Sequence, residues 1–227
     1  MKVTVIIAAG GKGTRIGAGK NKVFLKLLDK EVLYYTISAF ENNKNIDDII
    51  VVTAEADIGD CEKLINRYNF TKIAKIIKGG KTRQESVIKG LRECDGDIVL
   101  IHDGARAFVT DTEIDNTISD CIKYGAAAAG VKCKDTLKIS SGGFIKETVD
   151  RENTYLIQTP QAFQRKEILS LHEKAFAEGL EATDDCMIAE HYGVKIKISE
   201  GSYDNIKLTT PEDMIIGESI LKERGGK

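Results

Sequence analysis

The chain has few cysteines for its length, and their arrangement argues against two common kinds of protein. Among 227 residues there are five cysteines, at positions 61, 94, 121, 133 and 186. Their number is odd, and no two of them form a Cys-x-x-Cys pair. We therefore expect neither a disulfide framework nor a structural zinc site, and a reducing compartment fits better.

Long apolar runs are also missing. No stretch approaches the roughly 18 residues that a membrane-spanning helix needs. The first apolar segment, Val3–Ala9, runs into Gly10-Gly11-Lys12 before it is long enough for a signal peptide. We therefore expect a cytoplasmic protein with no membrane partner. The formal net charge of −2 likewise argues against a nucleic-acid partner, because domains that bind nucleic acid are usually basic.

Linker-like segments are absent as well. The chain has only two prolines, shows no internal repeat, and contains no stretch rich in proline, glycine or serine that could join separate domains. With 42% hydrophobic and 30% charged residues it is an ordinary globular sequence, long enough to bury a core. The sequence predicts one domain over residues 1–227.

Short runs of β-branched residues alternate with amphipathic segments along most of the chain. This alternation is typical of βαβ units and predicts an α/β fold, with a mostly parallel sheet covered by helices on both faces. Thr82 with Glu85 predicts a capping box, and Thr210-Pro211 places proline at the start of the last helix. Candidate strands are Val3–Ala8, Asp48–Thr53, Lys72–Lys78, Asp97–His102, Ala127–Lys132 and Val194–Ile198, and candidate helices are Val32–Asn42, Asp60–Tyr68, Arg83–Cys94 and Asp111–Tyr124.

One segment interrupts the alternation. Residues Asp135–Asp150 have the pattern of two strands joined by a turn at Ser140-Ser141-Gly142-Gly143. A two-stranded hairpin has marginal stability by itself. The residues alone leave two possibilities open: the hairpin folds back onto its own domain, or it packs against a second subunit.

The loop after the first strand combines glycine with positive charge. The segment Gly10-Gly11-Lys12-Gly13-Thr14-Arg15 fits neither the phosphate-binding P-loop nor the dinucleotide fingerprint, because Thr14 and Ile16 stand where those motifs need glycine. Residues 1–28 nevertheless contain six lysines or arginines and no acidic residue. Basic side chains on a glycine loop suit a triphosphate, whereas the alternative is a solvated basic stretch. We favour phosphate binding.

A series of further motifs follows in order, and together they resemble a known family. The first loop, with Lys22 after it, is similar to the signature of nucleotidyltransferases that join a sugar or polyol phosphate to a nucleoside triphosphate. The other motifs are Gly79-Gly80-Lys81-Thr82-Arg83-Gln84-Glu85-Ser86, His102-Asp103-Gly104-Ala105-Arg106, Asp135-Thr136-Leu137-Lys138, Val149-Asp150-Arg151, Gln158-Thr159-Pro160-Gln161, Thr183-Asp184-Asp185 and Asp204-Asn205-Ile206-Lys207. The whole set resembles the 2-C-methyl-D-erythritol 4-phosphate cytidylyltransferase family.

The resemblance implies a fold, a reaction and an assembly. The fold is a Rossmann-like three-layer sandwich of the nucleotide-diphospho-sugar transferase type, in which residues 135–150 form an arm that interlocks with a second subunit. The reaction is attack by a phosphate oxygen of a polyol phosphate on the α-phosphorus of CTP, with release of pyrophosphate. A homodimer in which Arg151 reaches the neighbouring site is expected, with Mg²⁺ or another divalent cation as cofactor.

The resemblance also assigns expected roles to individual residues. Four basic side chains, Arg15, Lys22, Arg151 and Lys207, are the expected catalytic groups, and Asp103 is the expected metal ligand. The expected nucleotide-binding residues are Ala9, Gly10, Gly11, Gly13, Thr14, Gly80, Ser86, Asp103, Gly104 and Arg106, of which Ala9, Gly10, Gly80 and Ser86 hold the cytosine. The expected polyol-phosphate residues are Thr136, Arg151, Thr159, Thr183 and Lys207.

Departures from the pattern and rival functions also bear on the assignment. The family often has a proline before the loop lysine, where this chain has Asn21. A sister enzyme that uses ribitol 5-phosphate is the nearest alternative, and Ala8-Ala9-Gly10 favours the methylerythritol enzymes over it. A catalytically silent nucleotide-binding module would have no reason to keep Lys22, Arg151 and Lys207 together. A dehydrogenase is disfavoured by the failed dinucleotide fingerprint. His102 is expected to be packed and hydrogen-bonded rather than catalytic.

Overall fold

The computed structural model describes residues 1–11 and 21–225, and in this part of the chain seven strands form a central sheet. The strands lie in the order β11-β7-β10-β6-β1-β4-β5, and neighbours are parallel except for β10, which is antiparallel to both β6 and β7. The strands are β1 (Val3–Ala8), β4 (Asp48–Thr53), β5 (Ile73–Lys78), β6 (Ile98–Asp103), β7 (Ala126–Lys132), β10 (Tyr155–Gln164) and β11 (Lys197–Glu200). The predicted α/β fold with a mostly parallel sheet is confirmed.

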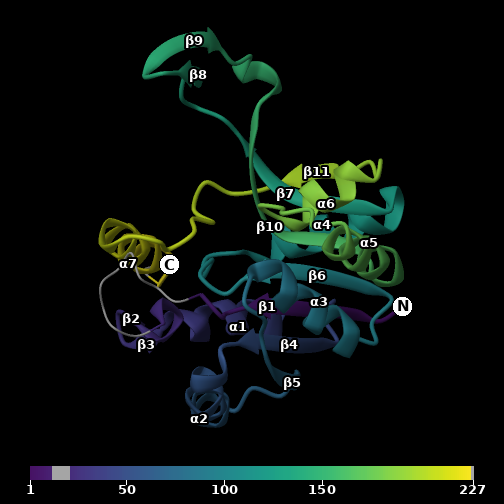
Figure 1. Cartoon of the computed structure of the whole chain (residues 1–227). Coiled ribbons are helices and arrows are strands. Elements are labelled where there is room, and N and C mark those ends of the chain that lie inside the picture. Colours follow the sequence, from purple (N-terminus) through teal and green to yellow (C-terminus); the bar gives the residue numbers. More distant parts are fainter. Residues whose placement is uncertain (12–20, 226–227) are drawn as a thin grey trace.

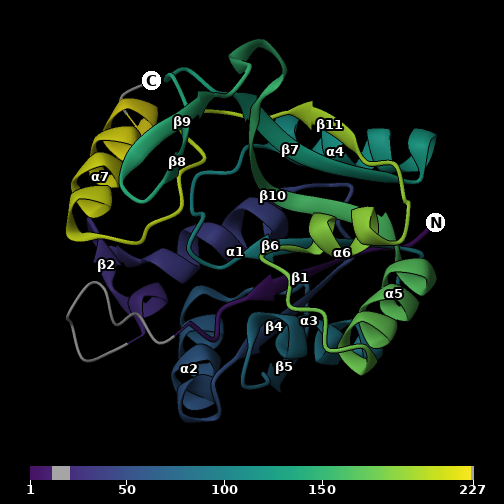
Figure 2. The same ribbon diagram turned by 45° about the horizontal axis from the view of Figure 1, so that its top comes forward.

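Helices cover the sheet on both sides (Figure 1). Figure 2 shows α4 and α6 on opposite faces of the sheet. The α-helices are α1 (Val32–Asn42), α2 (Ile58–Tyr68), α3 (Arg83–Glu93), α4 (Asp111–Tyr124), α5 (Arg165–Ala177), α6 (Asp185–His191) and α7 (Pro211–Gly225). Short 3-10 helices are η2 (Lys22–Phe24), η3 (Glu55–Asp57) and η4 (Arg151–Asn153). Two small hairpins pair β2 (Lys26–Leu27) with β3 (Lys30–Glu31) and β8 (Lys138–Ser141) with β9 (Phe144–Thr148).

The core is divided by the sheet into two layers. Along β1, Val5 and Ile7 face a cluster that includes residues of α1, α2 and α4, whereas Ile6 faces a cluster that includes residues of α3, α5 and α6. Each of these three β1 side chains is fully buried. An apolar run buried on both faces is the pattern that a parallel strand between two helical layers requires. A third, smaller cluster joins α7 to β2 through Phe108, Leu208 and Ile220.

Most predicted elements have their predicted positions. Four of them, among them Val3–Ala8 and Asp111–Tyr124, are found with the same bounds. Pro211 begins α7, as expected. The last strand is displaced: it spans Lys197–Glu200 rather than Val194–Ile198. The reason is that the amide of Val194 still donates to Ala189 in the turn that ends α6, so the chain is free to pair with β7 only further on.

Two further differences have local causes. The prediction of a capping box at Thr82 was half right, because the amide of Glu85 donates to the Thr82 hydroxyl (3.1 Å) but the Glu85 carboxylate accepts from the amide of Lys81 (2.9 Å). The strand β10 was not predicted, because its buried half carries the polar side chains of Gln158, Thr159 and Gln161.

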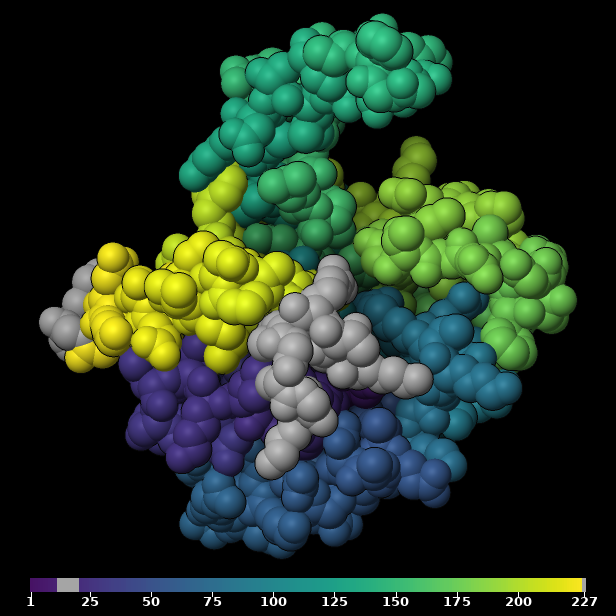
Figure 3. Space-filling view, turned by 60° about the vertical axis from the view of Figure 1, so that its left-hand side comes forward, coloured from purple at the N-terminus to yellow at the C-terminus, as the bar shows by residue number. Residues whose placement is uncertain are grey.

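The predicted hairpin at residues 135–150, which we call the arm, is confirmed as a hairpin. Its strands β8 and β9 pair antiparallel, and it stands away from the body of the molecule (Figures 1 and 3). Ile139, Phe144 and Ile145 on the arm are exposed, with Phe144 retaining 79% of its accessible surface. Within the described residues, no helix is both long and apolar enough to cross a membrane.

Candidate active site at the carboxyl edge of the sheet

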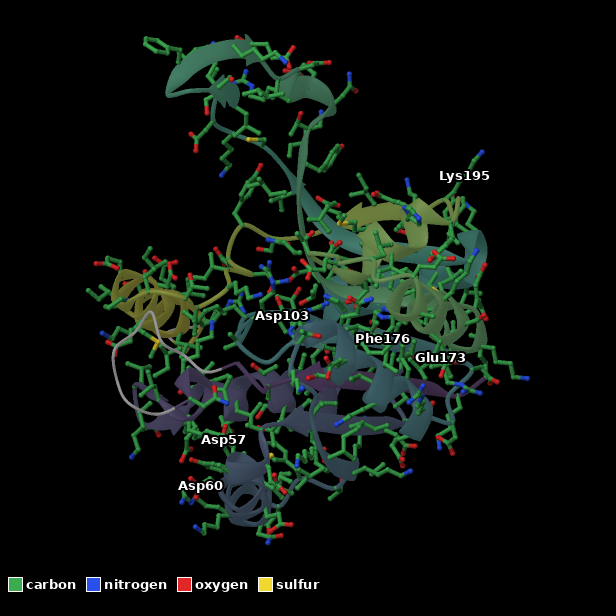
Figure 4. The ribbon with its side chains drawn as sticks, in the orientation of Figure 1. Asp57, Asp60, Asp103, Glu173, Phe176 and Lys195 are labelled. Carbon is green, nitrogen blue, oxygen red and sulfur yellow. The ribbon has the colours of Figure 1, made fainter. Side chains whose placement is uncertain are left out.

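Three basic side chains meet around one carboxylate at the end of β6. Asp103 is the last residue of that strand, where it pairs with Ala8 at the end of β1. Its carboxylate lies 2.7 Å from Nζ of Lys207, 3.3 Å from Nε of Arg83 and 3.7 Å from Nε of Arg106. Figure 4 shows Asp103 near the centre of the molecule with nitrogen atoms grouped around it. Because the carboxyl ends of strands in open α/β sheets bind ligands, this cluster is the candidate site.

The carboxylate and its neighbours carry a net positive charge. Burial alone would raise the pKa of Asp103, but the charges of Arg83 and Lys207 outweigh burial and hold that pKa well below its ordinary value. Asp103 is therefore ionised at neutral pH, and three cations surround one anion. Nε of Arg106 has no hydrogen-bond partner among the described residues.

A buried chain of hydrogen bonds through Thr159 and His102 holds the backbone of Asp103 in place. The amide of Asp103 donates to Oγ1 of Thr159 (3.0 Å), which lies 3.1 Å from Nδ1 of His102. Nε2 of His102 lies 3.0 Å from the carbonyl oxygen of Arg106, and since a carbonyl can only accept, Nε2 carries the proton. Nδ1 then accepts from the Thr159 hydroxyl. Burial lowers the pKa of His102 to about 4, so this neutral tautomer persists at neutral pH.

This chain places two of the expected residues. Thr159 was expected in the polyol-phosphate pocket, and its side chain is buried, with the hydroxyl occupied by Asp103 and His102. His102 is fully buried and packs edge-on against Phe40, in agreement with the expectation of a packed histidine. Both residues lie beneath the site and hold the end of β6 in place.

A second carboxylate holds Arg83 from the other side. Nη2 of Arg83 donates to Oδ2 of Asp185 (2.7 Å), the first residue of α6. Asp185 is fully buried, and Nε2 of His172 lies 3.2 Å from its other oxygen, although not aligned as a hydrogen bond. Burial opposes the charge of Asp185, but Arg83 and His172 hold the pKa of Asp185 below its ordinary value. Arg83 thus bridges two ionised carboxylates, and their charges raise its pKa.

Arg83 and Asp185 received no role in the sequence analysis. Both lie inside the motifs that carried the resemblance, Gly79–Ser86 and Thr183-Asp184-Asp185. A charged residue within a matching motif was the only available signal. It did not indicate that the two side chains meet, because they are far apart in the chain and lie on different helices.

Lys207 reaches the site from the segment before α7, which is tied down along its length. The amide of Leu208 donates to the carbonyl of Ala105 (2.9 Å), and the Asn205 carbonyl accepts from Nη1 of Arg106 (2.7 Å). Asn205 is fully buried, and its side-chain Nδ2 donates to Oε1 of Glu113 and to the carbonyl oxygen of Thr159, both at 3.0 Å. These bonds join the end of β6 to the segment that carries Lys207. They bring together Arg106, which was expected to bind nucleotide, and Lys207, which was expected to bind the polyol phosphate, and both roles stay predictions.

The residues expected to hold cytosine lie around the ends of β1, β4 and β5. The amide of Ala9 donates to Val52 (2.7 Å), and the amide of Gly80 donates to Oγ of Ser86 (3.0 Å). A side chain on Gly104 would press against Ala8 and Ala9, and one on Gly80 would collide with Glu85. The strand ends are therefore packed too closely at these two glycines for larger residues.

The first loop is described only at its two ends. Gly11 is exposed, and Lys22 is the first residue of η2. Gly13, Thr14 and Arg15 lie outside the described residues. The structure thus places Gly10 and Lys22 at the two ends of the loop. The roles expected of Gly13, Thr14 and Arg15 stay predictions.

The remaining expected residues do not join the Asp103 cluster within one chain. Thr136 is exposed on the arm, and Arg151 follows it and donates to the carbonyl of Lys134 (3.3 Å) at the base of the arm. The arm, which carries Thr136, stands away from the body of the molecule (Figure 1). Thr183 is exposed just before Asp184, which caps α6 and binds the side chain of Gln161 (2.8 Å).

Comparisons with known proteins agree over almost the whole chain. The family model described as 2-C-methyl-D-erythritol 4-phosphate cytidylyltransferase matches residues 3–223. A protein of that name from Clostridium novyi is 48% identical over 224 residues, covering 97% of both chains, and one from Clostridium acetobutylicum is 46% identical over 221 residues, covering 96% of both.

Solved structures give the same result. The crystal structure of 4-diphosphocytidyl-2C-methyl-D-erythritol synthase from Anaerococcus prevotii superposes with a TM-score of 0.87 at 32% identity, covering 97% of this chain and 96% of that one. The structure of 2-C-methyl-D-erythritol 4-phosphate cytidylyltransferase from Thermus thermophilus superposes with a TM-score of 0.79 at 27% identity, covering 98% of this chain and 100% of that one.

Proposed function

The chain belongs to the 2-C-methyl-D-erythritol 4-phosphate cytidylyltransferase family, and we propose that the cluster around Asp103 carries out the reaction of this family. The protein is a CTP-dependent nucleotidyltransferase of isoprenoid precursor biosynthesis. A phosphate oxygen of 2-C-methyl-D-erythritol 4-phosphate attacks the α-phosphorus of CTP, and the bond to the β-phosphate breaks. The products are 4-diphosphocytidyl-2-C-methyl-D-erythritol and pyrophosphate.

One observation supports this placement most strongly: three cations converge on one carboxylate at the ligand-binding edge of the sheet. Both reactants are anions, so the reaction needs positive charge that lets two phosphates approach and that stabilises the charge of the transition state. A phosphate nucleophile is already ionised near neutral pH, so no general base is required. Positioning and electrostatics are therefore sufficient catalytic contributions.

We assign Lys207 and Arg106 to the phosphate oxygens. Lys207 is 40% exposed at its side chain, so its ammonium group can exchange Asp103 for a substrate oxygen. Arg106 is held by Asn205 through Nη1 and keeps Nε unsatisfied. Lys22 and Arg15 act on the triphosphate, where a guanidinium can bind two oxygens at once and an ammonium supplies a compact charge. Asp103 orients Lys207 and Arg106 before substrate binds.

The cytosine lies, in this proposal, between the ends of β1 and β5. Ala9, Gly10, Gly80 and Ser86 border this space, and Gly11, Gly13, Thr14 and Gly104 complete the nucleotide site. The amide of Ala9 is already committed to Val52, and Oγ of Ser86 is committed to Thr82 and Gly80. These two residues would act mainly by shape, leaving room for a pyrimidine.

We further propose Mg²⁺ as the cofactor, held by Asp103. Within residues 1–11 and 21–225 no group of three or more His, Cys, Asp or Glu side chains could hold a metal by itself. A single ionised carboxylate fits Mg²⁺, which is often bound by one or two carboxylates together with substrate phosphates and water. When bound with CTP, such an ion would neutralise charge on the phosphate oxygens. Lys207, which pairs with Asp103, would contact those same oxygens.

The arm completes the site across a homodimer in this proposal, in which residues 1–227 form one domain. Thr136 lies on the arm and Arg151 directly follows it, and the arm stands away from the body of the molecule (Figure 1). Phe144 and Ile145 are exposed on the arm, and burial of large apolar side chains stabilises a protein. Packing of the arm against a second subunit would bury both side chains. Arg151 of one subunit would then hold the phosphate nucleophile in the other.

A mixing experiment tests the shared site. Arg151→Ala and Lys207→Ala each inactivate both sites of their own dimers. Co-refolded together, they form mixed dimers in which one site carries both substitutions and the other carries neither. About a quarter of wild-type activity should return, as random pairing in a twofold dimer predicts. No recovery, with mixed dimers verified by two affinity tags, contradicts the shared site.

The substrate assignment is tested by pyrophosphate release. CTP with 2-C-methyl-D-erythritol 4-phosphate should give product, whereas ATP, GTP and UTP should give little. Product with ribitol 5-phosphate alone would reassign the chain to the sister enzyme. Equal use of all four triphosphates would contradict the cytosine site. Binding of CTP without turnover on either polyol would indicate a silent nucleotide-binding module.

A further inference from the structure

Asn21 joins the two ends of the first loop. Its side chain is buried, with 8% of the residue exposed. Nδ2 donates to the carbonyl of Ala9 (2.7 Å) and to Oδ2 of Asp57 (2.8 Å). An amide NH₂ group has two hydrogens, so both are used. Ala9 follows β1 directly, and Asn21 directly precedes Lys22, so one side chain connects the residues that flank the segment 10–20.

Asn21 also sets the backbone that carries Lys22. It is the N-cap of η2, whose first residue is Lys22, and its Oδ1 accepts from the amide of Val23 (3.4 Å). Its carbonyl accepts from the amide of Phe24 (3.0 Å). The direction in which Lys22 leaves the backbone therefore depends on a residue whose side chain is fixed by Ala9 and Asp57.

Asp57 holds Asn21 from the start of α2. It is the last residue of η3 as well as the N-cap of α2, and its backbone is helical (φ −98°, ψ −6°), unlike the extended backbone with which an aspartate normally caps a helix. Here the Asp57 side chain makes no capping hydrogen bond. Its carboxylate binds Asn21 instead. Ala9 contributes as well, because its amide is anchored to Val52 of β4 (2.7 Å).

We propose that Asn21 and Asp57 form a clamp that positions Lys22 for the triphosphate of CTP. The proposal rests on the function proposed above and adds two positioning residues that touch neither substrate. The bond to the Asp57 carboxylate is the stronger of the two, since a hydrogen bond to a carboxylate exceeds one to a carbonyl oxygen. Without the clamp, Lys22 would have to be ordered at the moment CTP binds, at a cost in affinity and rate.

The experiment compares Asn21→Ala and Asp57→Ala with Asp60→Ala. Asp60 is a matched control: like Asp57 it lies at the start of α2 (Figure 4), but its carboxylate pairs with Lys63 (3.0 Å) rather than with Asn21. Initial rates are measured with each substrate varied in turn, at a temperature well below the unfolding midpoint of every variant.

Asn21→Ala should lower kcat/KM for CTP by about 10- to 100-fold, the equivalent of one hydrogen bond to a charged group. The KM for the polyol phosphate should change little, because Lys22 serves the triphosphate. A general loss of folding would not produce this split between substrates. The double variant of Asn21 and Asp57 should be no worse than the more damaged single one, because both substitutions break the same contact.

Three results would overturn the proposal. They are wild-type kcat/KM for CTP in Asn21→Ala, equal losses in Asp57→Ala and Asp60→Ala, and multiplied losses in the double variant. The affinity for CTP alone, measured by calorimetry, separates this inference from the proposed function. If the wild type bound CTP without turning it over, the proposed function would fail, whereas weaker CTP binding by Asn21→Ala and not by Asp60→Ala would still support the clamp.

Discussion

Replacing Asp185 by asparagine tests whether the ion pairs of Arg83 with Asp185 and Asp103 stabilise the fold. Asp185 is fully buried and binds Nη2 of Arg83 at 2.7 Å, while Arg83 reaches Asp103 on its other side. The substitution keeps the size and shape of the side chain but removes its charge. Arg83, whose side chain is 28% exposed, is then left with one carboxylate instead of two.

The expected loss of stability follows from this geometry. Removing one partner of a buried ion pair costs about 3–5 kcal/mol, because an uncompensated charge stays behind. Asparagine can still accept one hydrogen bond from Arg83, and Asp103 remains at 3.3 Å, so we expect the lower end of this range. For a chain of this length about 3 kcal/mol corresponds to a fall in Tm of roughly 6–12 °C.

The assay is urea unfolding at pH 7, followed by circular dichroism. The midpoint should fall while the slope stays the same, since the substitution changes stability and not the surface exposed on unfolding. Asp204→Asn is the control: Asp204 is exposed and pairs with Arg224 at 3.4 Å, and surface pairs of this kind contribute little. An Asp185→Asn protein as stable as this control would refute the reasoning.

The pH dependence gives a second check on the same substitution. The folded pKa of Asp185 lies below its unfolded value, so its contribution to stability is present above about pH 4 and lost as the pH falls through the folded pKa. The Asp185→Asn variant has no such contribution to lose. The difference in stability between the two proteins should therefore narrow below pH 4, and a constant difference would contradict the assignment.

Three further predictions follow from single observations. Burial lowers the pKa of His102 to about 4, so its contribution to the free energy of unfolding is full above about pH 6.5 and declines as the pH falls towards 4. Between pH 6.5 and 5 the free energy of unfolding, measured in urea, should therefore fall less in His102→Gln than in the wild type. Lys207→Ala should lower kcat by about 10²–10³-fold, as loss of one preorganised donor does, with partial recovery in Lys207→Arg, measured by pyrophosphate release. A methyl group on Gly90 would lie 2.7 Å from the side chain of Ile6 and 3.2 Å from that of Val52. Gly90→Ala should therefore lower Tm despite the higher helix propensity of alanine, and a raised Tm would contradict the packing between α3 and the sheet.

The polar half of β10 shows where prediction from sequence failed. Gln158, Thr159 and Gln161 are buried, yet their polarity hides the strand from any search for apolar alternation. Each forms a hydrogen bond with a group from elsewhere in the chain: Gln158 with Ser202, Thr159 with Asp103, and Gln161 with Asp184. Such partners are known only once the chain has folded.

The sequence by itself determined most of the elements and their order, with β10 as the main exception, because apolar period, capping residues and turn glycines act between residues that are close in the chain. It therefore predicted β1, α1 and α4 to the residue, the arm with its turn, and the family. Only the tertiary structure decided that Arg83 joins Asp103 to Asp185, and that Asn21 is held by Ala9 and Asp57. These contacts join distant segments whose approach is set by the packing of whole helices and strands, and no local pattern records it.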